Sequence, residues 1–341
     1  MGHPDVENQT PLVFEPLFLV DEEFCPIFVP VIKGTFRIGD RGDCQLAEEQ
    51  APLSMEGELW SDDPATSSYK YEPEVAFFKP ATDVVLVGHA HAPHSGATEV
   101  NVGLNVGSLR KSAIVFGDRL WFRSAGAWAT TRPVPFEKMP LTYERAFGGW
   151  DRSHPDPNRH AVDVRNPVGT GFGPAANGEA RLPNIEDPSA LIRQFGERPP
   201  PAGFGFVSPH WQPRAALSGT FDAAWLKERS PRLPKNFDRR HFNAASAGLV
   251  AQGYLRGDEA VTTIGTTREG RLSFNLPAMP APEVRVVFHG KKEQRLVPNL
   301  DTVIIEPDER RVLLLWRAWT KLRTGPQDVS DVEVTPRKYL S

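Results

Sequence analysis

The composition of the 341-residue chain excludes several classes of protein. Lys and Arg number 39 against 43 Asp and Glu, a net charge of −4, so no overall basic character favours nucleic acid or an anionic membrane as a partner. The 2 cysteines cannot form a disulfide framework, and the first residues lack the basic and apolar segments of a secretory signal. No apolar run reaches the ~18–20 residues of a membrane helix. We therefore expect a soluble, cytoplasmic protein.

The abundance of proline and glycine predicts short strands and long ordered loops. The chain has 33 prolines and 28 glycines, which remove backbone donors from sheets and favour turns. Its 8 Trp and 20 Phe argue against disorder, because disordered segments are poor in aromatic residues. Arginine is more frequent than lysine, and its forked donors are suited to bracing loops against carbonyls and carboxylates.

The first third of the chain, residues 12–123, is predicted to be antiparallel β structure. Residues 12–38 are rich in β-branched and aromatic residues, with Gly and Pro at the breaks. Over residues 100–106 apolar residues alternate with Asn and Gly, which places Val and Leu on one face of a strand. Gly117–Asp118 separates two apolar runs and predicts a tight hairpin turn.

The middle of the chain, residues 130–248, has many turn residues and little periodicity, so we predict a loop-rich region. Three short helices are expected in it: one at 187–195 capped by Asp187, one after Thr220 in TFDAAWLKER, and one at 239–246. Loop regions of this length are usually functional or wrapped over a sheet.

The last part, residues 250–323, returns to strands and includes a hairpin around Pro307–Arg310, and the polar tail 324–341 is expected to fray. No linker and no internal repeat is visible, so we predict one compact domain, 1–341, in which the terminal strands share sheets. The predicted fold class is α+β and predominantly β, with a large antiparallel, sandwich-like core, long ordered loops and two or three short helices.

The histidines of VGHAHAPHSG raise the question of a metal site. The stretch resembles the HxHxDH zinc motif of metallo-hydrolases, but Pro93 stands where that motif has Asp. On an extended segment His89 and His91 share a face, which supplies two of the three or four ligands that zinc requires. The remaining histidines have no ligand spacing. His89 and His91 are therefore the candidate metal ligands, and the alternative is a strand end that carries imidazoles.

Other catalytic signatures are absent from the sequence: GxSxG, HExxH, CxxC and GxxxxGK[ST] do not occur. The glycines of GTGFG are followed by Pro174 and not by an amphipathic helix, so they are interpreted as turn residues. We predict no catalytic residues and no cofactor.

Two aromatic and arginine-rich segments, YERAFGGWDR and HWQPR, are candidates for contacts with a partner protein. Arg, Trp and Tyr are the residue types that anchor interfaces, although a tight turn braced by an internal Glu–Arg interaction gives the same pattern. The stretches 143–172 and 204–214 are favoured as the contact regions. The candidate protein-binding residues are Tyr143, Arg145, Trp150, Arg165, Asn166, Trp211 and Arg214.

Several long blocks resemble a known family. KPATDVVLVGHAHAP, VFGDRLW, PFEKMPLTYERAFGG, RNPVGTGF, LPNIEDP and GTFDAAWLKERSPRLPKNFD follow in an order similar to that of the bacterial domain of unknown function 2169 family, over residues 12–320. His89 and His91 match the family's VGHAHAP stretch, whereas His94 occupies a variable place.

The resemblance implies an accessory role in type VI secretion, as an adaptor or chaperone that binds a secreted effector and helps load it on a VgrG/PAAR spike-tip protein. The family has no established active site, so the resemblance carries over no catalytic residue. Two alternatives stay open: a metal-dependent hydrolase that uses the His89 and His91 region, and a structural protein that stabilises the spike.

Overall fold

Two sheets form the centre of the protein in the computed structural model, which describes residues 4–174, 179–290 and 292–337. The larger has the order β2-β3-β25-β24-β7, with β4 and β26 also paired to β3. β7 runs parallel to β24, and the other neighbours in this sheet are antiparallel. The strands are β2 (Val13–Val20), β3 (Pro26–Ile38), β4 (Cys44–Leu46), β7 (Asp83–Leu86), β24 (Asn299–Glu306), β25 (Arg311–Arg317) and β26 (Thr320–Lys321). Strands from the two ends of the chain thus share one sheet, as predicted.

The second sheet has the order β19-β10-β9-β20-β21 and is antiparallel. Its strands are β9 (Glu99–Val106), β10 (Leu109–Phe116), β19 (Ile185–Glu186), β20 (Ala260–Ile264) and β21 (Arg271–Asn275). The alternation predicted over 100–106 is confirmed, since Val102, Leu104 and Val106 are buried on one face of β9. A single cluster of buried apolar side chains includes residues from both sheets.

The C-terminal tail forms a strand and does not fray over residues 329–335. A four-stranded sheet has the order β1-β27-β22-β23, with β1 parallel to β27. Its strands are β1 (Asp5–Asn8), β22 (Glu283–Phe288), β23 (Glu293–Leu296) and β27 (Val329–Thr335). Val329, Val332 and Val334 are buried, and this apolar side of β27 explains why the tail is ordered.

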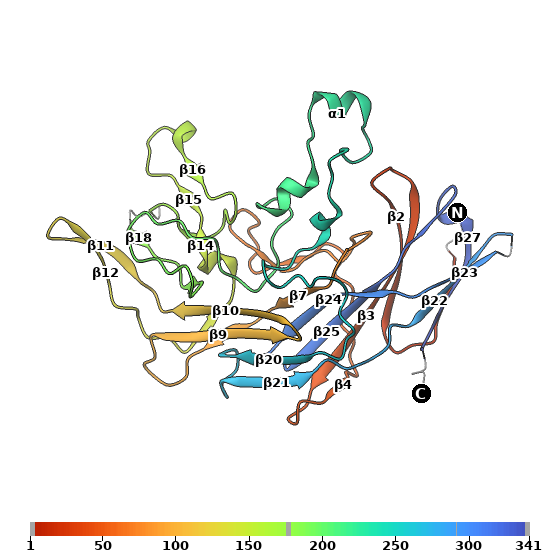
Figure 1. Ribbon diagram of the computed structural model, residues 1–341, viewed down its shortest axis with the longest axis horizontal. Helices are drawn as coiled ribbons and strands as arrows, with labels where there is room; N and C mark the ends of the chain where they lie inside the picture. Colours follow the sequence, from red (N-terminus) through yellow and green to blue (C-terminus); the bar gives the residue numbers. More distant parts are fainter. Residues whose placement is uncertain (1–3, 175–178, 291, 338–341) are drawn as a thin grey trace.

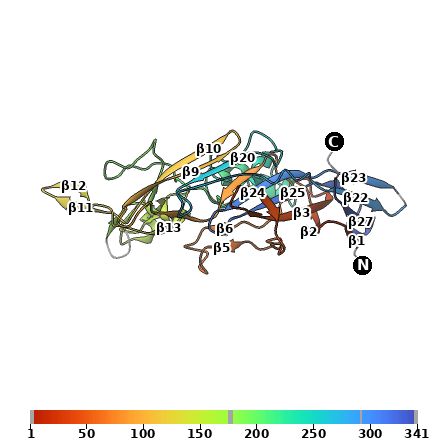
Figure 2. The same cartoon turned by 90° about the horizontal axis from the view of Figure 1, so that it is seen from below.

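Eight further strands form four short pairs around the two central sheets (Figures 1 and 2). They are β5 (Glu58–Leu59) with β6 (Tyr69–Tyr71), β8 (His89–His91) with β13 (Lys138–Pro140), β14 (Phe147–Gly148) with β17 (Thr170–Gly171), and β15 (Trp150–Asp151) with β16 (Ala161–Val162). Seen from below, the molecule is long and thin (Figure 2). The predominantly β class is confirmed.

The Gly117–Asp118 turn does not close a hairpin, contrary to the prediction. The strand after it, β11 (Leu120–Ser124), pairs instead with β12 (Ala127–Thr130) and β18 (Ala180–Arg181). A Cβ at Gly117 would lie 1.7 Å from the carbonyl oxygen of Val134, so glycine is required there for the close approach of that segment. The hairpin predicted around Pro307–Arg310 does join β24 to β25.

One α-helix is present among the described residues, α1 (Ala223–Glu228), which is capped by Asp222 and follows Thr220 as predicted. The helix expected at 187–195 is absent. The bond from Ser189 N–H to Asp187 is one that a helix cap also makes. Farther on, however, carboxylates accept backbone N–H groups that a helix would bond internally: Glu186 accepts from Ile192, and Glu197 accepts from Arg193 and Gln194.

The other helical turns are short 3₁₀ helices. They are η1 (Tyr143–Arg145), η2 (Pro157–Arg159), η3 (Arg214–Ser218), η4 (Arg239–Phe242) and η5 (Pro326–Asp328). The helix predicted at 239–246 is thus reduced to η4. Among the described residues, no helix is long and apolar enough to cross a membrane.

Candidate functional site

Four of the seven candidate protein-binding residues are buried inside the loop-rich middle. Tyr143 is 4% exposed and packs edge-on against Trp211, which is 6% exposed, with ring centroids 5.4 Å apart. Asn166 is fully buried and donates to the carbonyls of Tyr143 (2.7 Å) and Phe147 (3.1 Å). These side chains hold the middle region together, and a partner could contact them only if that region opened.

Arg214 is the fourth buried candidate. Its guanidinium donates to the carbonyls of His241 and Val207, both at 2.6 Å, and pairs with the buried carboxylate of Glu72. Burial by itself raises the pKa of Glu72, and the positive charge of Arg214 opposes that effect. Arg214 therefore joins η4 to the loops at Val207 and Glu72, which is the bracing role that the arginine-rich composition predicts.

The other three candidates lie at the surface. Trp150 is 41% exposed, with the Arg152 guanidinium 4.8 Å from its ring centroid. Arg165 pairs with Asp163 at 2.6 Å. Arg145 lines a hollow at one end of the molecule, whereas Trp150 and Arg165 do not. The seven candidate protein-binding residues therefore fall into two groups: four are buried and hold the middle region together, and three lie at separate positions on the surface.

The two histidine candidates meet on a carboxylate. His89 Nδ1 lies 2.8 Å from Asp308 Oδ2, and His91 Nε2 lies 2.8 Å from Asp308 Oδ1. Lys138 Nζ is 3.1 Å from the same carboxylate, which belongs to the β24–β25 turn. Burial alone would raise the pKa of Asp308, but hydrogen bonds from both histidines and Lys138 hold it well below its ordinary value.

This arrangement is a charged cluster that attaches β8 to the β24–β25 turn. Within the described ranges, no group of three or more His, Cys, Asp or Glu side chains is arranged to hold a metal ion. His94, the third histidine of the stretch, is exposed, and its ring Nδ1 lies 3.0 Å from the carbonyl oxygen of Ser95.

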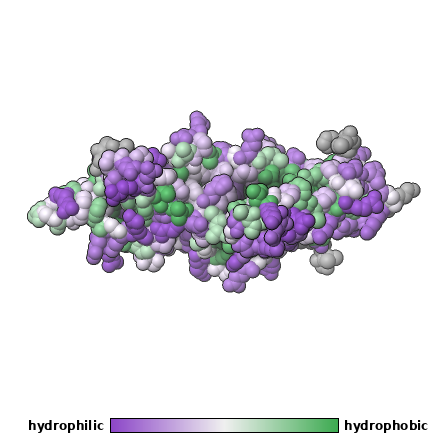
Figure 3. Space-filling model, turned by 90° about the horizontal axis from the view of Figure 1, so that it is seen from above, coloured by the Kyte–Doolittle hydropathy of each residue, from purple (hydrophilic) through white to green (hydrophobic). Residues whose placement is uncertain are grey.

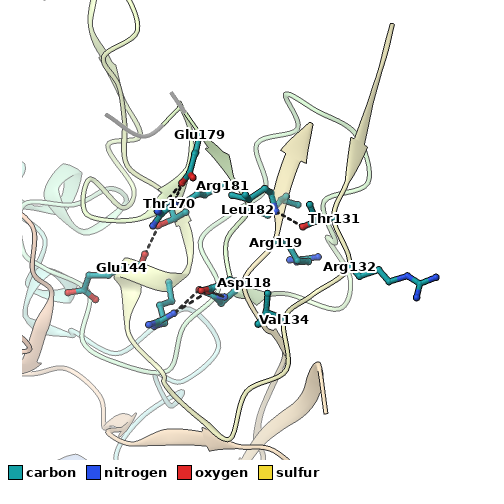
Figure 4. A pocket seen from close by; sticks show the side chains of 13 residues that line it. Asp118, Arg119, Thr131, Arg132, Val134, Glu144, Thr170, Glu179, Arg181 and Leu182 are labelled. Carbon is teal, nitrogen blue, oxygen red and sulfur yellow. Dashed lines mark hydrogen bonds and ion pairs between the residues drawn. The ribbon is translucent and has the colours of Figure 1, made fainter. Parts of the chain in front are cut away.

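A hollow of about 630 Å³ lies where β11, β18 and the segment after β12 meet η1, and we call it the arginine hollow (Figure 4). Four arginines and three carboxylates are among the residues that line it. The lining residues are Asp118, Arg119, Leu120, Thr131, Arg132, Val134, Glu144, Arg145, Thr170, Glu179, Arg181, Leu182 and Asn184. Guanidinium groups suit the recognition of carboxylates and carbonyls, so the hollow is suited to polar groups of a polypeptide.

Two of these arginines are fixed in place. Arg119 donates to the carbonyl of Pro183 (2.9 Å), pairs with buried Glu186 and lies over the ring of Phe116. Arg145 donates to Asn184 Oδ1 at 3.0 Å and lies 3.8 Å from Asp118. Such bonds orient the guanidinium groups in advance, which lowers the entropic cost of binding.

The other two arginines are more accessible. Arg181 is 58% exposed in its side chain and pairs with Glu179 at 3.0 Å. Arg132 is exposed, and its side chain has no ion-pair partner within the described part of the chain. Figure 4 shows Arg132 extending away from the other labelled side chains, so its guanidinium is accessible to a partner.

An aromatic cluster extends from the arginine hollow along the β11–β12 hairpin. Phe195 stacks on Trp128, with centroids 3.8 Å apart and planes 12° apart, and meets Trp121 edge-on at 5.8 Å. Phe195 remains 47% exposed, and Phe122, on the opposite face of the hairpin, is 44% exposed. Figures 1 and 2 show this hairpin projecting from one end of the molecule.

One edge of the hairpin is free. The strand order is β12-β11-β18, so among the described residues β12 has a partner on one side only. Thr131 donates its N–H to the carbonyl of Leu120 (2.9 Å), so the backbone of Thr131 faces β11. In an antiparallel pair successive residues alternate in this respect, and the N–H and C=O groups of Trp128 and Thr130 therefore point away from β11. β12 has no Lys or Pro to block pairing, whereas the edge strand β2 has Pro16. The sequence pattern alone did not reveal this edge.

The fold and site define a β-rich protein with a projecting edge strand, exposed aromatic side chains and an arginine-lined hollow at one end. The chain belongs to the family described as uncharacterized protein conserved in bacteria (DUF2169), whose model matches residues 23–317. The family named from the sequence blocks is thereby confirmed. Its description names no function. No curated protein and no solved structure matches the chain.

Proposed function

We propose that the protein is a cytoplasmic adaptor that binds an extended segment of another polypeptide along the free edge of β12. The observation that carries this proposal is the unpaired edge itself, which projects from the molecule and has exposed aromatic residues on both faces. An extended segment that adds to such an edge gains main-chain hydrogen bonds, and side-chain pockets supply its specificity.

The surroundings of β12 favour a polypeptide over a small molecule. Outward N–H and C=O groups of Trp128 and Thr130 give four main-chain bonding positions to an incoming strand. Aromatic side chains of the kind found at Phe122 and Phe195 anchor interfaces. Thr131 and Arg132 follow β12 directly and line the arginine hollow, so a strand bound to β12 would extend to its guanidinium groups.

The proposed client is a type VI secretion effector, which the adaptor would load on the spike-tip protein. This part of the proposal rests first on the resemblance of the sequence blocks to the family. It rests also on a physical requirement: a protein that loads a client must later release it, and a partly polar interface allows that release. A hydrolase that uses His89 and His91 and a structural protein that stays with the fired spike are the competing functions.

The edge can be tested with a pair of substitutions at one position. Thr130→Pro removes an N–H that points away from β11, whereas Thr130→Ala removes the same side chain and keeps the N–H. With the effector and the spike-tip protein encoded by neighbouring genes as probes, we expect Thr130→Pro to weaken effector binding at least about tenfold and Thr130→Ala to leave it nearly unchanged. Equal binding by both variants would show that β12 is not the contact.

The competing functions give different results. Normal secretion of the effector after deletion of the gene would contradict the adaptor role. Stoichiometric metal that is lost in the His89→Ala, His91→Ala double variant, together with hydrolytic turnover, would favour the hydrolase. Retention of the protein in the fired complex would favour a structural role.

A further inference from the structure

The two faces of the β11–β12 hairpin carry different side chains. Residues that lie opposite each other in an antiparallel pair share a face, and the face changes at each step along a strand. The register of β11 and β12 therefore places four side chains on one face: Trp121, Arg123, Trp128 and Thr130. The other face, which we call the Phe122 face, carries Phe122, Ser124, Ala127 and Ala129.

The face with Trp128 is packed by groups of the chain itself. Phe195 stacks on the Trp128 ring, with centroids 3.8 Å apart, and the guanidinium carbon of Arg123 lies 4.5 Å from the centroid of the same ring. Trp128 is accordingly only partly exposed. A client strand therefore finds the Trp128 ring already in contact with Phe195 and Arg123.

The Phe122 ring lacks such contacts. It is 44% exposed and makes no aromatic or cation–π contact within the described part of the chain. The residue opposite it on β12 is Ala129, and the next residue of β12 on this face is Ala127, so both neighbours are small. Figure 3 shows hydrophobic side chains beside hydrophilic ones at the left end of the molecule, where the hairpin projects in Figure 1. The Phe122 face therefore has an exposed ring next to two methyl groups.

A client strand on the free edge of β12 would place one side chain beside Ala129. Successive side chains of a strand alternate between its faces, so every second client side chain lies on the Phe122 face, whichever way the client runs. Neighbouring strands are ~4.8 Å apart, so the client would lie ~9.6 Å from β11. Because Ala129 has only a methyl group between them, a long client side chain can reach over it to the Phe122 ring.

We propose that the client segment is selected by one large apolar side chain, such as leucine or phenylalanine, which packs over Ala129 against the Phe122 ring. This inference rests on the proposed function, in which a polypeptide adds to β12, and it names the side chain that the edge recognises. The main-chain groups of Trp128 and Thr130 bond to any sequence, whereas Phe122 and Ala129 determine specificity. A small or polar client side chain at this position gains the main-chain bonds alone.

The test uses the full chain and a peptide selected on it by phage display of random sequences, with fluorescence anisotropy as the readout. We expect alanine substitution along the peptide to reveal one large apolar residue whose loss weakens binding at least about tenfold. Phe122→Ala in the chain should weaken the unaltered peptide by a similar factor. The two substitutions together should add little more, because both remove the same contact. Phe221→Ala is the matched control, since that ring is 53% exposed beside α1, and should leave binding unchanged.

A second variant tests the space over Ala129 and keeps the Phe122 ring. Ala129→Leu fills that space, so it should weaken the selected peptide at least about tenfold. The peptide with alanine at the key position should bind Ala129→Leu at least as well as it binds the unaltered chain, because its small side chain does not need the space. Both substitutions are at exposed or partly exposed positions, which tolerate a change without unfolding.

The outcomes separate this inference from the proposed function. A peptide that loses binding in Thr130→Pro and in Phe122→Ala supports both. Loss in Thr130→Pro with equal binding by Phe122→Ala overturns the inference and leaves the proposed edge contact standing. Binding that is unchanged in Thr130→Pro, or a selection that enriches no peptide, contradicts the edge contact and this inference together.

Discussion

Two aromatic pairs in the loop-rich half of the molecule have opposite roles. Tyr143 and Trp211 are 4% and 6% exposed and close the inside of the middle region. Trp128 and Phe195 stack at the projecting hairpin, where Phe195 is 47% exposed. Each pair joins a tryptophan to a second aromatic ring, so the main difference between the pairs lies in what surrounds them. Burial therefore assigns Tyr143 and Trp211 to the core, whereas the exposure of Phe195 leaves its ring accessible to a partner.

The largest effect should come from the buried pair. Trp211→Ala removes a large buried side chain and leaves a cavity, which should lower the free energy of unfolding by ~3–5 kcal/mol. Chemical denaturation followed by circular dichroism measures this change. A loss below ~1 kcal/mol would mean that Trp211 is not part of the core, and the comparison of the two pairs would fail.

A similar loss should follow at neutral pH from Arg214→Met, because the buried Glu72 carboxylate is then left unpaired, at a cost of ~3–5 kcal/mol. Burial raises the pKa of Glu72, so the folded variant takes up a proton more readily than the unfolded chain. The destabilisation caused by Glu72 should therefore shrink as pH falls, and be smallest below the unfolded pKa of ~4.3.

The denaturation midpoint of Arg214→Met, compared at pH 7 and pH 5, measures this dependence. The double variant with Glu72→Gln is the control, since it has no carboxylate to protonate. If the single and double variants had the same pH profile, Glu72 would not be the group responsible.

A smaller effect is expected at the histidine cluster. Asp308→Asn removes the charge that His89, His91 and Lys138 contact, and should cost ~1–2 kcal/mol at pH 7. The pKa of Asp308 is lowered in the folded state, so its contribution is complete above ~4 and is lost as pH falls toward the lowered value. Thermal melts of both proteins should therefore converge below pH 4. A constant difference down to pH 2 would contradict this account.

The smallest change in stability should come from Phe195→Ala, at most ~1 kcal/mol, because the ring is about half exposed. The same substitution should weaken effector binding by about tenfold or more if the cluster is an interface anchor. Isothermal titration calorimetry and a thermal melt of one preparation give both numbers. A large loss of stability would place Phe195 with Trp211 as a structural residue.

Much of the fold could be predicted from local sequence patterns. The alternation over 100–106 and the turn at Pro307–Arg310 specify a strand and a hairpin, and both occur. The helix expected at 187–195 is absent because the carboxylates of Glu186 and Glu197 accept N–H groups that a helix would bond internally. The cap and periodicity signals of the segment do not predict this competition. The break at Gly117 depends on Val134 from another part of the chain.

The candidate site was less predictable. Tyr, Trp and Arg anchor cores and interfaces alike, so the pattern could not separate Trp211 from Trp128. The free edge of β12 depends on which strands pair, and that is decided by contacts distant in sequence. Arg145 is the predicted residue that reaches the arginine hollow, together with three arginines that the sequence did not single out.

Hydrogen–deuterium exchange of the chain with and without its effector tests the central claim most directly. The outward amides of Trp128 and Thr130 should exchange fast in the free chain and become protected in the complex, while the buried Tyr143 and Trp211 segments stay unchanged. Protection that appears elsewhere, with the β12 amides as fast as before, would contradict the binding of a polypeptide at this edge.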